Sequence, residues 1–311
     1  MSLHSLSISP CDVSCCSSAI LDFGFCFPPS PRGIFYTSGS VSFCSTQHTQ
    51  CHRFSLECVT MMSLRRISSL MRSQKKAAQR WHHTSLTNDL IENMDKKVTW
   101  DRFYTENNRK GNFKNFEWFF GFDSVKEYIL PLVQTTCNTN SPLHVLDIGC
   151  GTSAMGPCIY THSQSAVNVT CADISPVAVR LMQEHVGSTL PQPRNPSSTV
   201  VFREMDCTEL EGYFGPRSLA LIVDKGTTDA LVRSKMGQAK AGQILKQCLK
   251  VLRPSGSLLQ FSDEDPDARL LWLEMESQDS EVAVDVGLWE VGELRGVTYF
   301  CYHISPSVNQ H

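Results

Sequence analysis

The run from Val145 to Ser153 constrains the fold of this chain more than any other stretch. It reads Val-Leu-Asp-Ile-Gly-Cys-Gly-Thr-Ser, an apolar stretch that contains an acid and ends in two closely spaced glycines. Since glycine has no Cβ, Gly149 and Gly151 let the backbone turn sharply after a strand and approach a ligand closely. The run predicts a buried parallel strand that passes into a helix around a nucleotide-like ligand. An ordinary strand-to-helix turn with two glycines is the alternative.

Predicted strands and helices alternate through the second half of the chain. We expect strands near residues 143–148, 167–172, 199–205, 218–223 and 256–261, and helices near residues 123–134, 154–162, 176–186 and 238–252. This alternation predicts a parallel sheet with helices on both faces. Residues 282–304 read as two more strands joined through Gly292 to Gly296, which predicts a C-terminal antiparallel hairpin. The expected fold is α/β and Rossmann-like, with its ligand at the carboxyl ends of the strands.

An acid follows the second strand of this sheet. Asp173 stands 24 residues after Gly149, where nucleoside-binding α/β folds accept the ribose hydroxyls on a carboxylate. The competing role is to cap the next helix, but Ser175 before Pro176 suits that role better. We therefore expect Asp173 to bind ribose.

Several segments resemble those of class I S-adenosylmethionine-dependent methyltransferases. The loop from Gly149 to Ser153 is similar to their motif I, and Asp206-Cys207 is similar to their adenine site, with a plain surface carboxylate as the alternative for Asp206. The string from Asp224 to Leu231 resembles the seven-β-strand protein lysine methyltransferases that act on elongation factor 1A and on citrate synthase.

Other segments resemble a smaller group within these enzymes. Residues 100–104 and 116–122 look like the same lysine methyltransferases, and residues 259–267 look like those that act on mitochondrial citrate synthase. The resemblance covers about residues 98–305. It implies a seven-stranded class I methyltransferase fold, mostly parallel with a C-terminal antiparallel hairpin, in a domain spanning residues 88–311.

The resemblance implies S-adenosyl-L-methionine as the cofactor. The cofactor contacts that it implies are Trp100, Tyr104, Phe116, Gly149, Cys150, Gly151, Asp173, Ile174, Asp206, Cys207 and Lys225. Two positions depart from the family pattern. Ser153 stands where a third glycine is usual, and Phe116 stands where some relatives carry a tyrosine, so a hydroxyl hydrogen bond is lost there.

The implied reaction is methyl transfer to a lysine of mitochondrial citrate synthase. A lysine of another protein such as elongation factor 1A, a small-molecule acceptor, and a non-catalytic methyltransferase-like binding module are the alternatives. Because a lysine with a pKa of about 10.4 is almost wholly protonated, the site must desolvate its ammonium or accept its proton. We expect Asp224 to orient the amine and Asp263, in an acidic loop, to attract the lysine; a solvated loop is the competing reading.

The charge distribution restricts the partners. Residues 91–311 carry 20 basic and 27 acidic side chains, a net charge of −7. Such a domain is a poor candidate for binding nucleic acid and a better one for a basic protein partner.

The N-terminal residues predict an extension of about 87 residues. Residues 1–60 are rich in Ser, Cys, Pro and Gly without a sustained period, so we expect disorder. Residues 61–87 contain no acid and place apolar residues at helical spacing between arginines, which is typical of a mitochondrial transit peptide. A solvated basic linker is the alternative. The expected location is the mitochondrial matrix.

Cysteine spacing and hydropathy complete the expectations. The 14 cysteines form no Cys-x-x-Cys pair, so we expect no metal site. No run of 18 apolar residues occurs, so we expect no membrane insertion.

Overall fold

The computed structural model of the chain describes residues 34–37, 40–41, 90, 92–108, 113, 115–134, 141–234, 236–278, 280 and 282–307. The predicted N-terminal extension lies outside these residues, apart from two short strands, β1 (Ile34–Thr37) and β2 (Ser40–Val41). Its basic segment 61–87 is not described, so the transit peptide stays a prediction. Among the described residues, no helix is both long and apolar enough to cross a membrane.

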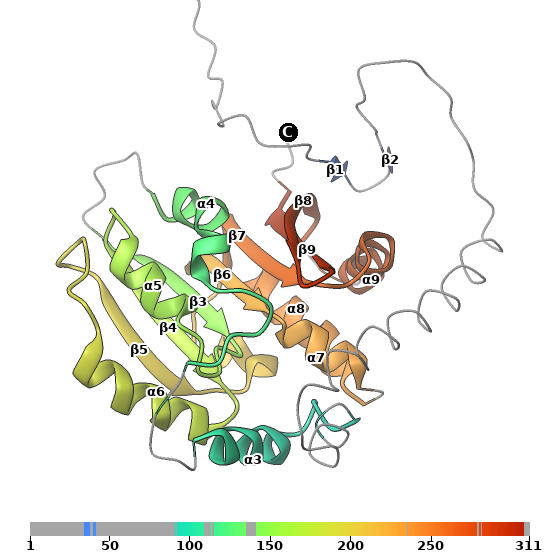
Figure 1. The fold of residues 1–311 in the computed structure, drawn as a ribbon. Helices are drawn as coiled ribbons and strands as arrows, with labels where there is room; N and C mark the ends of the chain where they lie inside the picture. Colours follow the sequence, from blue (N-terminus) through green and yellow to red (C-terminus); the bar gives the residue numbers. More distant parts are fainter. Residues whose placement is uncertain are drawn as a thin grey trace, which may run out of the picture. The chain divides into compact units, whose positions relative to one another are not determined.

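A mixed sheet forms the centre of the domain (Figure 1). Its parallel strands are β3 (Leu143–Ile148), β4 (Val167–Asp173), β5 (Thr199–Glu204), β6 (Leu219–Lys225) and β7 (Leu252–Ser262). The hairpin strands β8 (Val284–Leu294) and β9 (Val297–Pro306) run antiparallel. The strand order is β2-β1-β8-β9-β7-β6-β3-β4-β5. The seven strands β3 to β9 confirm the predicted class I methyltransferase architecture, and β1 extends it by pairing with β8.

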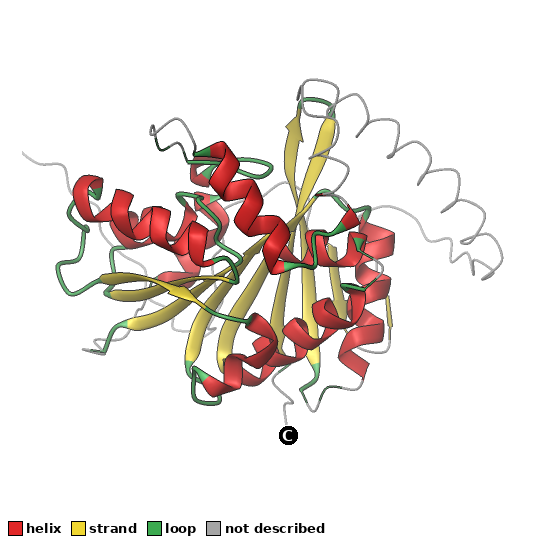
Figure 2. Cartoon of the chain, turned by 90° about the horizontal axis from the view of Figure 1, so that it is seen from below, coloured by secondary structure: helices red, strands yellow, loops and turns green. Residues whose placement is uncertain are grey.

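Helices pack on both faces of the sheet, as predicted (Figure 2). They are α5 (Met155–His162), α6 (Pro176–Thr189), α7 (Thr227–Arg233), α8 (Gln238–Val251) and α9 (Pro266–Gln278). Strand β3 contributes to the two hydrophobic cores that flank the sheet, because Val145 packs with α5, and Leu146 and Ile148 pack with α8. A strand buried on both faces needs an apolar run rather than an alternating pattern, which explains the sequence that leads into the glycine loop.

Four segments differ from the expected elements. The helix predicted over 123–134 is broken into α4 (Lys126–Ile129) between two short 3₁₀ turns, and Pro131, which has no N–H, lies in the second turn. The helices α3 (Lys97–Asn107), α7 and α9 were not predicted. In α9, Pro266 begins the helix directly after residues that we expected to form an acidic loop.

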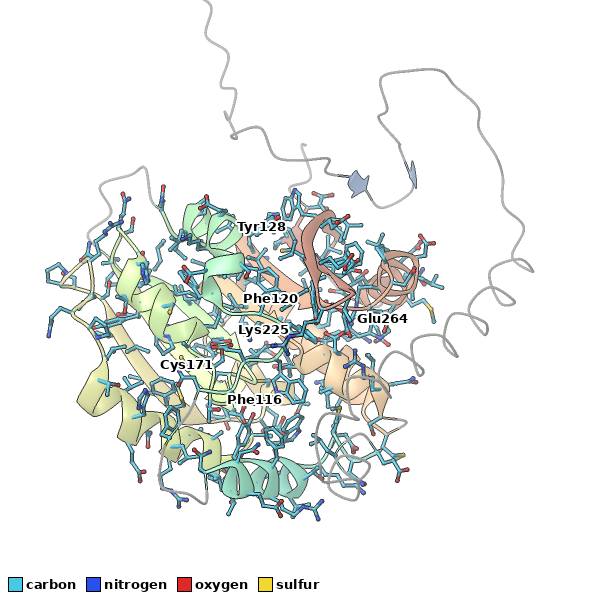
Figure 3. The ribbon with its side chains drawn as sticks, viewed as in Figure 1. Phe116, Phe120, Tyr128, Cys171, Lys225 and Glu264 are labelled. Carbon is cyan, nitrogen blue, oxygen red and sulfur yellow. The ribbon has the colours of Figure 1, made fainter. Side chains whose placement is uncertain are left out.

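The strand order indicates at which edge of the sheet a ligand binds. Successive strands run from β3 to β4 and β5 on one side and to β6 and β7 on the other, so the order reverses between β3 and β6. Open α/β sheets bind ligands at the carboxyl ends of the strands at such a reversal. The segment between α3 and α4 also reaches this edge, where the Lys225 side chain at the end of β6 meets the backbone of Phe120 (Figure 3).

Candidate active site

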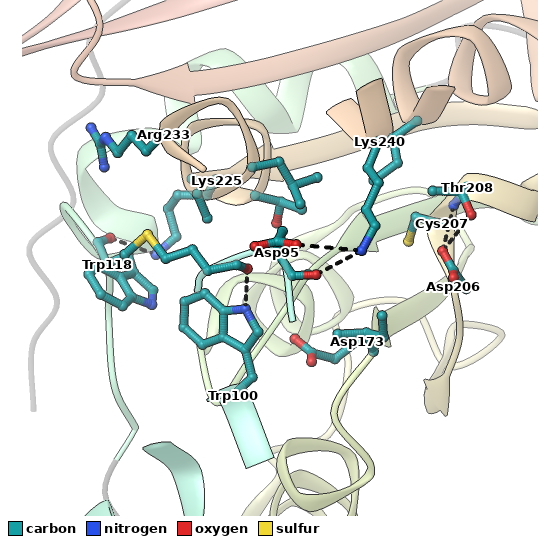
Figure 4. A pocket seen from close by; sticks show the side chains of 18 of the residues that line it. Asp95, Trp100, Trp118, Asp173, Asp206, Cys207, Thr208, Lys225, Arg233 and Lys240 are labelled. Atoms are coloured by element: carbon teal, nitrogen blue, oxygen red, sulfur yellow. Dashed lines mark hydrogen bonds and ion pairs between the residues drawn. The ribbon is translucent and has the colours of Figure 1, made fainter. Parts of the chain in front are cut away.

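A cavity opens at the carboxyl ends of β3, β4, β5 and β6 (Figure 4). It comprises about 950 Å³ of space, part of it open to solvent. Eight of the predicted site residues line it: Trp100, Tyr104, Gly149, Asp173, Ile174, Asp206, Cys207 and Lys225. Residues from six different elements or loops therefore meet in one place, as the sheet topology predicts.

The glycine loop holds the carboxylate of Asp173. The backbone N–H of Gly151 donates to Asp173 Oδ2 and that of Ser175 donates to Oδ1, both at 2.8 Å. Burial nevertheless raises the pKa of Asp173 to about 6. The N–H of Gly151 thus serves a carboxylate rather than a phosphate. This distinguishes the loop from a pyrophosphate-binding one, in which such groups face the ligand.

Ser175 takes the capping role that could have fallen to Asp173. Its hydroxyl accepts from the backbone N–H of Ala178 at 3.3 Å and donates to Asp101 at 2.6 Å. Helix α6 is therefore capped without the Asp173 side chain reaching into its first turn, and Asp173 lines the cavity instead.

Gly151 and Cys150 shape the cavity without lining it. Gly151 has φ +53°, and a Cβ there would overlap the hydroxyl of Tyr104, so glycine allows α3 to approach the loop. Cys150 is buried in a hydrophobic core, where its thiol contacts the carbonyl of Gly151 at 3.7 Å. The structure therefore does not bring these two predicted contacts to the cavity surface.

Asp206 lies at the end of β5 and faces the cavity together with Cys207. Its Oδ1 accepts from the backbone N–H of Thr208 at 2.9 Å and from the Thr208 hydroxyl at 2.7 Å. These two bonds fix the side chain and cap the short 3₁₀ helix Cys207–Gly212.

The ammonium of Lys225 is bound within the protein. Nζ donates to Glu117 Oε2 at 2.7 Å, to the carbonyl of Trp118 at 2.8 Å and to the carbonyl of Phe120 at 3.2 Å. An ammonium has three hydrogens, so all of them are used. Lys225 lines the cavity with the rest of its side chain and its backbone, and it fixes the segment 117–120 against β6.

The departure from the family pattern at Ser153 has a structural reason. The hydroxyl of Ser153 and the backbone N–H of Ala154 each donate to the carboxylate of Glu117 at 2.7 Å. A glycine at position 153 would lack the first of these bonds. Glu117 thus links the loop after β3 to Lys225 after β6.

Phe116 lies behind the cavity rather than in its wall. Its ring packs edge-to-face on Phe103 and Trp118, with centroid distances of 5.2 and 5.0 Å. Trp118 and Phe119 face the cavity instead. The segment has no regular secondary structure, so no period in the sequence tells which of its aromatic residues faces inward.

The two predicted catalytic acids do not line the cavity. Asp224 is buried and caps α7, since it accepts from the backbone N–H of Thr227 at 2.9 Å and of Thr228 at 3.3 Å. Burial raises its pKa to about 6. Asp263 forms an ion pair with Arg233, and it is Arg233 that faces the cavity. Each acid can therefore act only through the element or side chain that it holds.

Sequence reasoning missed Asp95 and Lys240. Asp95 lines the cavity from the turn before α3, and Lys240 lines it from α8. The hydroxyl of Ser234 donates to Asp95 Oδ1 at 2.7 Å. Lys240 Nζ donates to the carbonyl of Asp95 at 2.9 Å (Figure 4). These partners are 139 and 145 residues apart in the chain, so no local pattern signals them. They hold the turn before α3 against α7 and α8.

The wall of the cavity fits an adenosine-like group. Asp173 and Asp206, at the ends of adjacent strands, accept hydrogens from hydroxyl and amino groups. Ile174, Leu231 and Ile244 add an apolar surface suited to a flat base.

Comparison with known proteins agrees with this geometry. A family described as a methyltransferase domain matches residues 139–291. The mitochondrial citrate synthase-lysine N-methyltransferase of Danio rerio is 67% identical over 253 residues, which cover 80% of this chain and 100% of that protein. The enzyme of the same name from Homo sapiens is 43% identical over 215 residues, 68% of this chain and 86% of that protein.

A more distant relative carries a different name. An eEF1A lysine and N-terminal methyltransferase homolog of Drosophila pseudoobscura pseudoobscura is 30% identical over 172 residues, 52% of this chain and 22% of that protein. The matches to the first two relatives span most or all of their length, as the predicted resemblance requires. The chain therefore belongs to the mitochondrial citrate synthase-lysine N-methyltransferases, a family of S-adenosylmethionine-dependent enzymes.

Proposed function

We propose that the protein transfers a methyl group from S-adenosyl-L-methionine to a lysine of citrate synthase in the mitochondrial matrix. The observation that carries this proposal is the 67% identity over the full length of the zebrafish relative, whose name gives that reaction. The basic segment 61–87 supports the matrix location, as an import signal within an N-terminal extension of residues 1–87. The domain of residues 88–311 carries the activity.

The proposed cofactor contacts follow the order of the strands. Asp173 accepts the two ribose hydroxyls and Asp206 accepts from the exocyclic amine of adenine, beside Cys207 and Ile174. Trp100 and Tyr104 cover the cofactor from α3, and Gly149 allows close approach of the backbone. Gly151, Cys150 and Phe116 support these groups from behind the cavity wall. Lys225 contributes its backbone and the stem of its side chain, because its ammonium is already bound.

When bound, the cofactor supplies a methyl group on a sulfonium, which already carries its leaving group. The residues of the chain must then orient an uncharged amine. Among the described residues, three cations line the cavity, and each is paired with a carboxylate: Lys225 with Glu117, Arg233 with Asp263, and Lys240 with Asp95. Each cation is neutralised by its own carboxylate, so these three pairs add no net positive charge to the wall.

Asp224 and Asp263 then act as positioning residues. Asp224 caps α7 and so fixes Thr227, which lines the cavity. Asp263 fixes Arg233. This revises the expectation that either carboxylate meets the lysine directly.

Incubation of the purified protein with labelled cofactor and purified citrate synthase tests the proposal. Mass spectrometry should find the label on a lysine of citrate synthase and not on elongation factor 1A presented at the same concentration. Label on elongation factor 1A alone would replace the substrate. Cofactor binding without transfer to any protein in a mitochondrial extract would favour the binding-module alternative.

A further inference from the structure

The segment 117–120 forms one wall of the cavity without being a helix or a strand. It is held at three points by the buried ammonium of Lys225, which binds the side chain of residue 117 and the carbonyls of residues 118 and 120. The backbone N–H of Phe120 also donates to the carbonyl of Trp118 at 2.8 Å. The only residue of the segment that Lys225 does not bind is Phe119.

The three bonds from Lys225 surround a residue with an unusual backbone conformation, Phe119. Its φ of +64° lies in the left-handed region, which a bulky residue rarely adopts. Such strain persists only where the surroundings enforce it, and it often marks a functional site. Here the bonds on both sides of Phe119 enforce it, and the consequence is that the ring faces the cavity.

The ring of Phe119 has two close neighbours, Gly226 and Tyr299. A Cβ on Gly226 would stand 3.3 Å from the ring, so the absence of a side chain there lets the ring approach the end of β6. The ring also packs on Tyr299, with a centroid distance of 5.1 Å. Tyr299 also packs on Phe120 at 5.4 Å, so the aromatic group is anchored in the core.

The strand order shows which end of the cofactor this wall would face. Asp206 follows β5, Asp173 ends β4 and the glycine loop follows β3. Phe119 lies against Gly226, directly after β6. These strands are consecutive neighbours in the sheet. A nucleoside with its base at β5 and its ribose at β4 therefore extends its remaining end toward β6, where Phe119 stands.

The β8–β9 hairpin extends beyond the end of β7, next to Phe119. The last residue of β7, Ser262, pairs with Phe300, so Tyr299 and its partner Gly292 lie beyond the end of β7 on the cavity side of the sheet. The Phe119–Tyr299 contact thus connects the cavity with a part of the surface that a protein substrate could reach.

We propose that Phe119 forms the wall of the passage through which the acceptor lysine reaches the methyl group. The four methylenes of a lysine would pack on the ring, which removes water from the stem and directs the amine inward. The ring face would also attract an ammonium by a cation–π interaction. Phe119 is thereby a specificity-determining residue for the acceptor and not for the cofactor. This inference rests on the proposed transfer to a protein lysine.

Phe119→Gly tests the inference without adding strain, because glycine adopts a φ of +64° readily. The variant should lower kcat/KM for the protein acceptor by about 10- to 100-fold, the range expected when a reacting group is misplaced. Its affinity for the cofactor, measured by calorimetry, should stay within about twofold of wild type. Phe119→Leu, which keeps an apolar side chain, should retain more activity than Phe119→Gly.

Arg217→Gly is the matched control. Arg217 has φ +55° and lies just before β6, at the end of the strand away from the cavity, so the same relief of strain occurs without loss of the ring. It should transfer as wild type does. The variants are compared on whichever protein lysine the wild-type enzyme labels, so that a wrong substrate does not count against Phe119. Wild-type transfer by Phe119→Gly, or a parallel loss of cofactor affinity and transfer, would overturn the inference.

Discussion

The bonds that Lys225 donates to Glu117, Trp118 and Phe120 can be tested through Lys225→Met. This variant keeps the apolar stem of the side chain and removes its charge. The side chain of Lys225 is 5% exposed and that of Glu117 is 25% exposed. Breaking a buried pair by removing one partner costs about 3–5 kcal/mol, because the other charge is left uncompensated. Glu117 keeps its bonds from Ser153 and Ala154, so we expect the lower end, about 3 kcal/mol.

A loss of about 3 kcal/mol should lower the midpoint of thermal unfolding by about 6–12 °C in a domain of this size. Circular dichroism of the full chain measures it. Lys250→Met is the control, since Lys250 and Glu211 are 50% and 47% exposed and such pairs contribute about 0–1 kcal/mol. The double variant Glu117→Gln, Lys225→Met should be less destabilised than Lys225→Met, because no buried charge remains unpaired. A midpoint equal to that of the control, or a double variant as unstable as the single one, would refute the reasoning.

Three further predictions concern the buried carboxyl groups. Asp173→Ala should weaken cofactor binding at least about 100-fold, since it removes two charge-assisted acceptors, and calorimetry that found unchanged affinity would exclude the ribose role. Because burial raises the pKa of Asp173 to about 6 and the ionised form accepts hydroxyl hydrogens, cofactor affinity should rise between about pH 5 and pH 7; a flat profile would contradict this. Burial also raises the pKa of Asp147 to about 7 and of Asp224 to about 6. The folded protein therefore holds more protons than the unfolded chain, and the free energy of unfolding contributed by these groups should fall as pH rises from about 4 to 7. Urea unfolding measures this slope, and Asp147→Asn should reduce it.

The central strands β3 and β6 were predictable because they are buried on both faces. Residues 143–148 form β3 as expected, since a mostly apolar run of this length that ends at Gly149 is typical of a buried strand. The short helix α7 escaped prediction because its seven residues give too few turns for a period to show. The helix α9 escaped because its acidic first residues were read as a loop, although Pro266 signals a helix start.

The resemblance to known methyltransferases supplied Trp100 and Tyr104, while the pattern of strands alone predicts the part of the site that the fold itself assembles. Residues at strand ends, such as Asp173 and Asp206, meet because parallel strands share one edge. Trp118, Phe119 and Lys240 reach the cavity through contacts across 100 residues or more, as the Lys225 bonds to residues 117–120 show. Such contacts depend on packing geometry, which no local pattern encodes.

Hydrogen-bond capacity explains why three acids after successive strands have different proposed roles. A carboxylate offers about four acceptor positions, two on each oxygen. Asp224 uses its capacity on Thr227, Thr228 and Gln260, so it closes a helix end. Asp173 receives one bond on each oxygen from the described residues, which leaves one position on each and suits two ribose hydroxyls. Asp206 receives both of its bonds on Oδ1, which leaves Oδ2 for a single amino group. The residues that follow each acid therefore determine whether it serves the fold or a ligand.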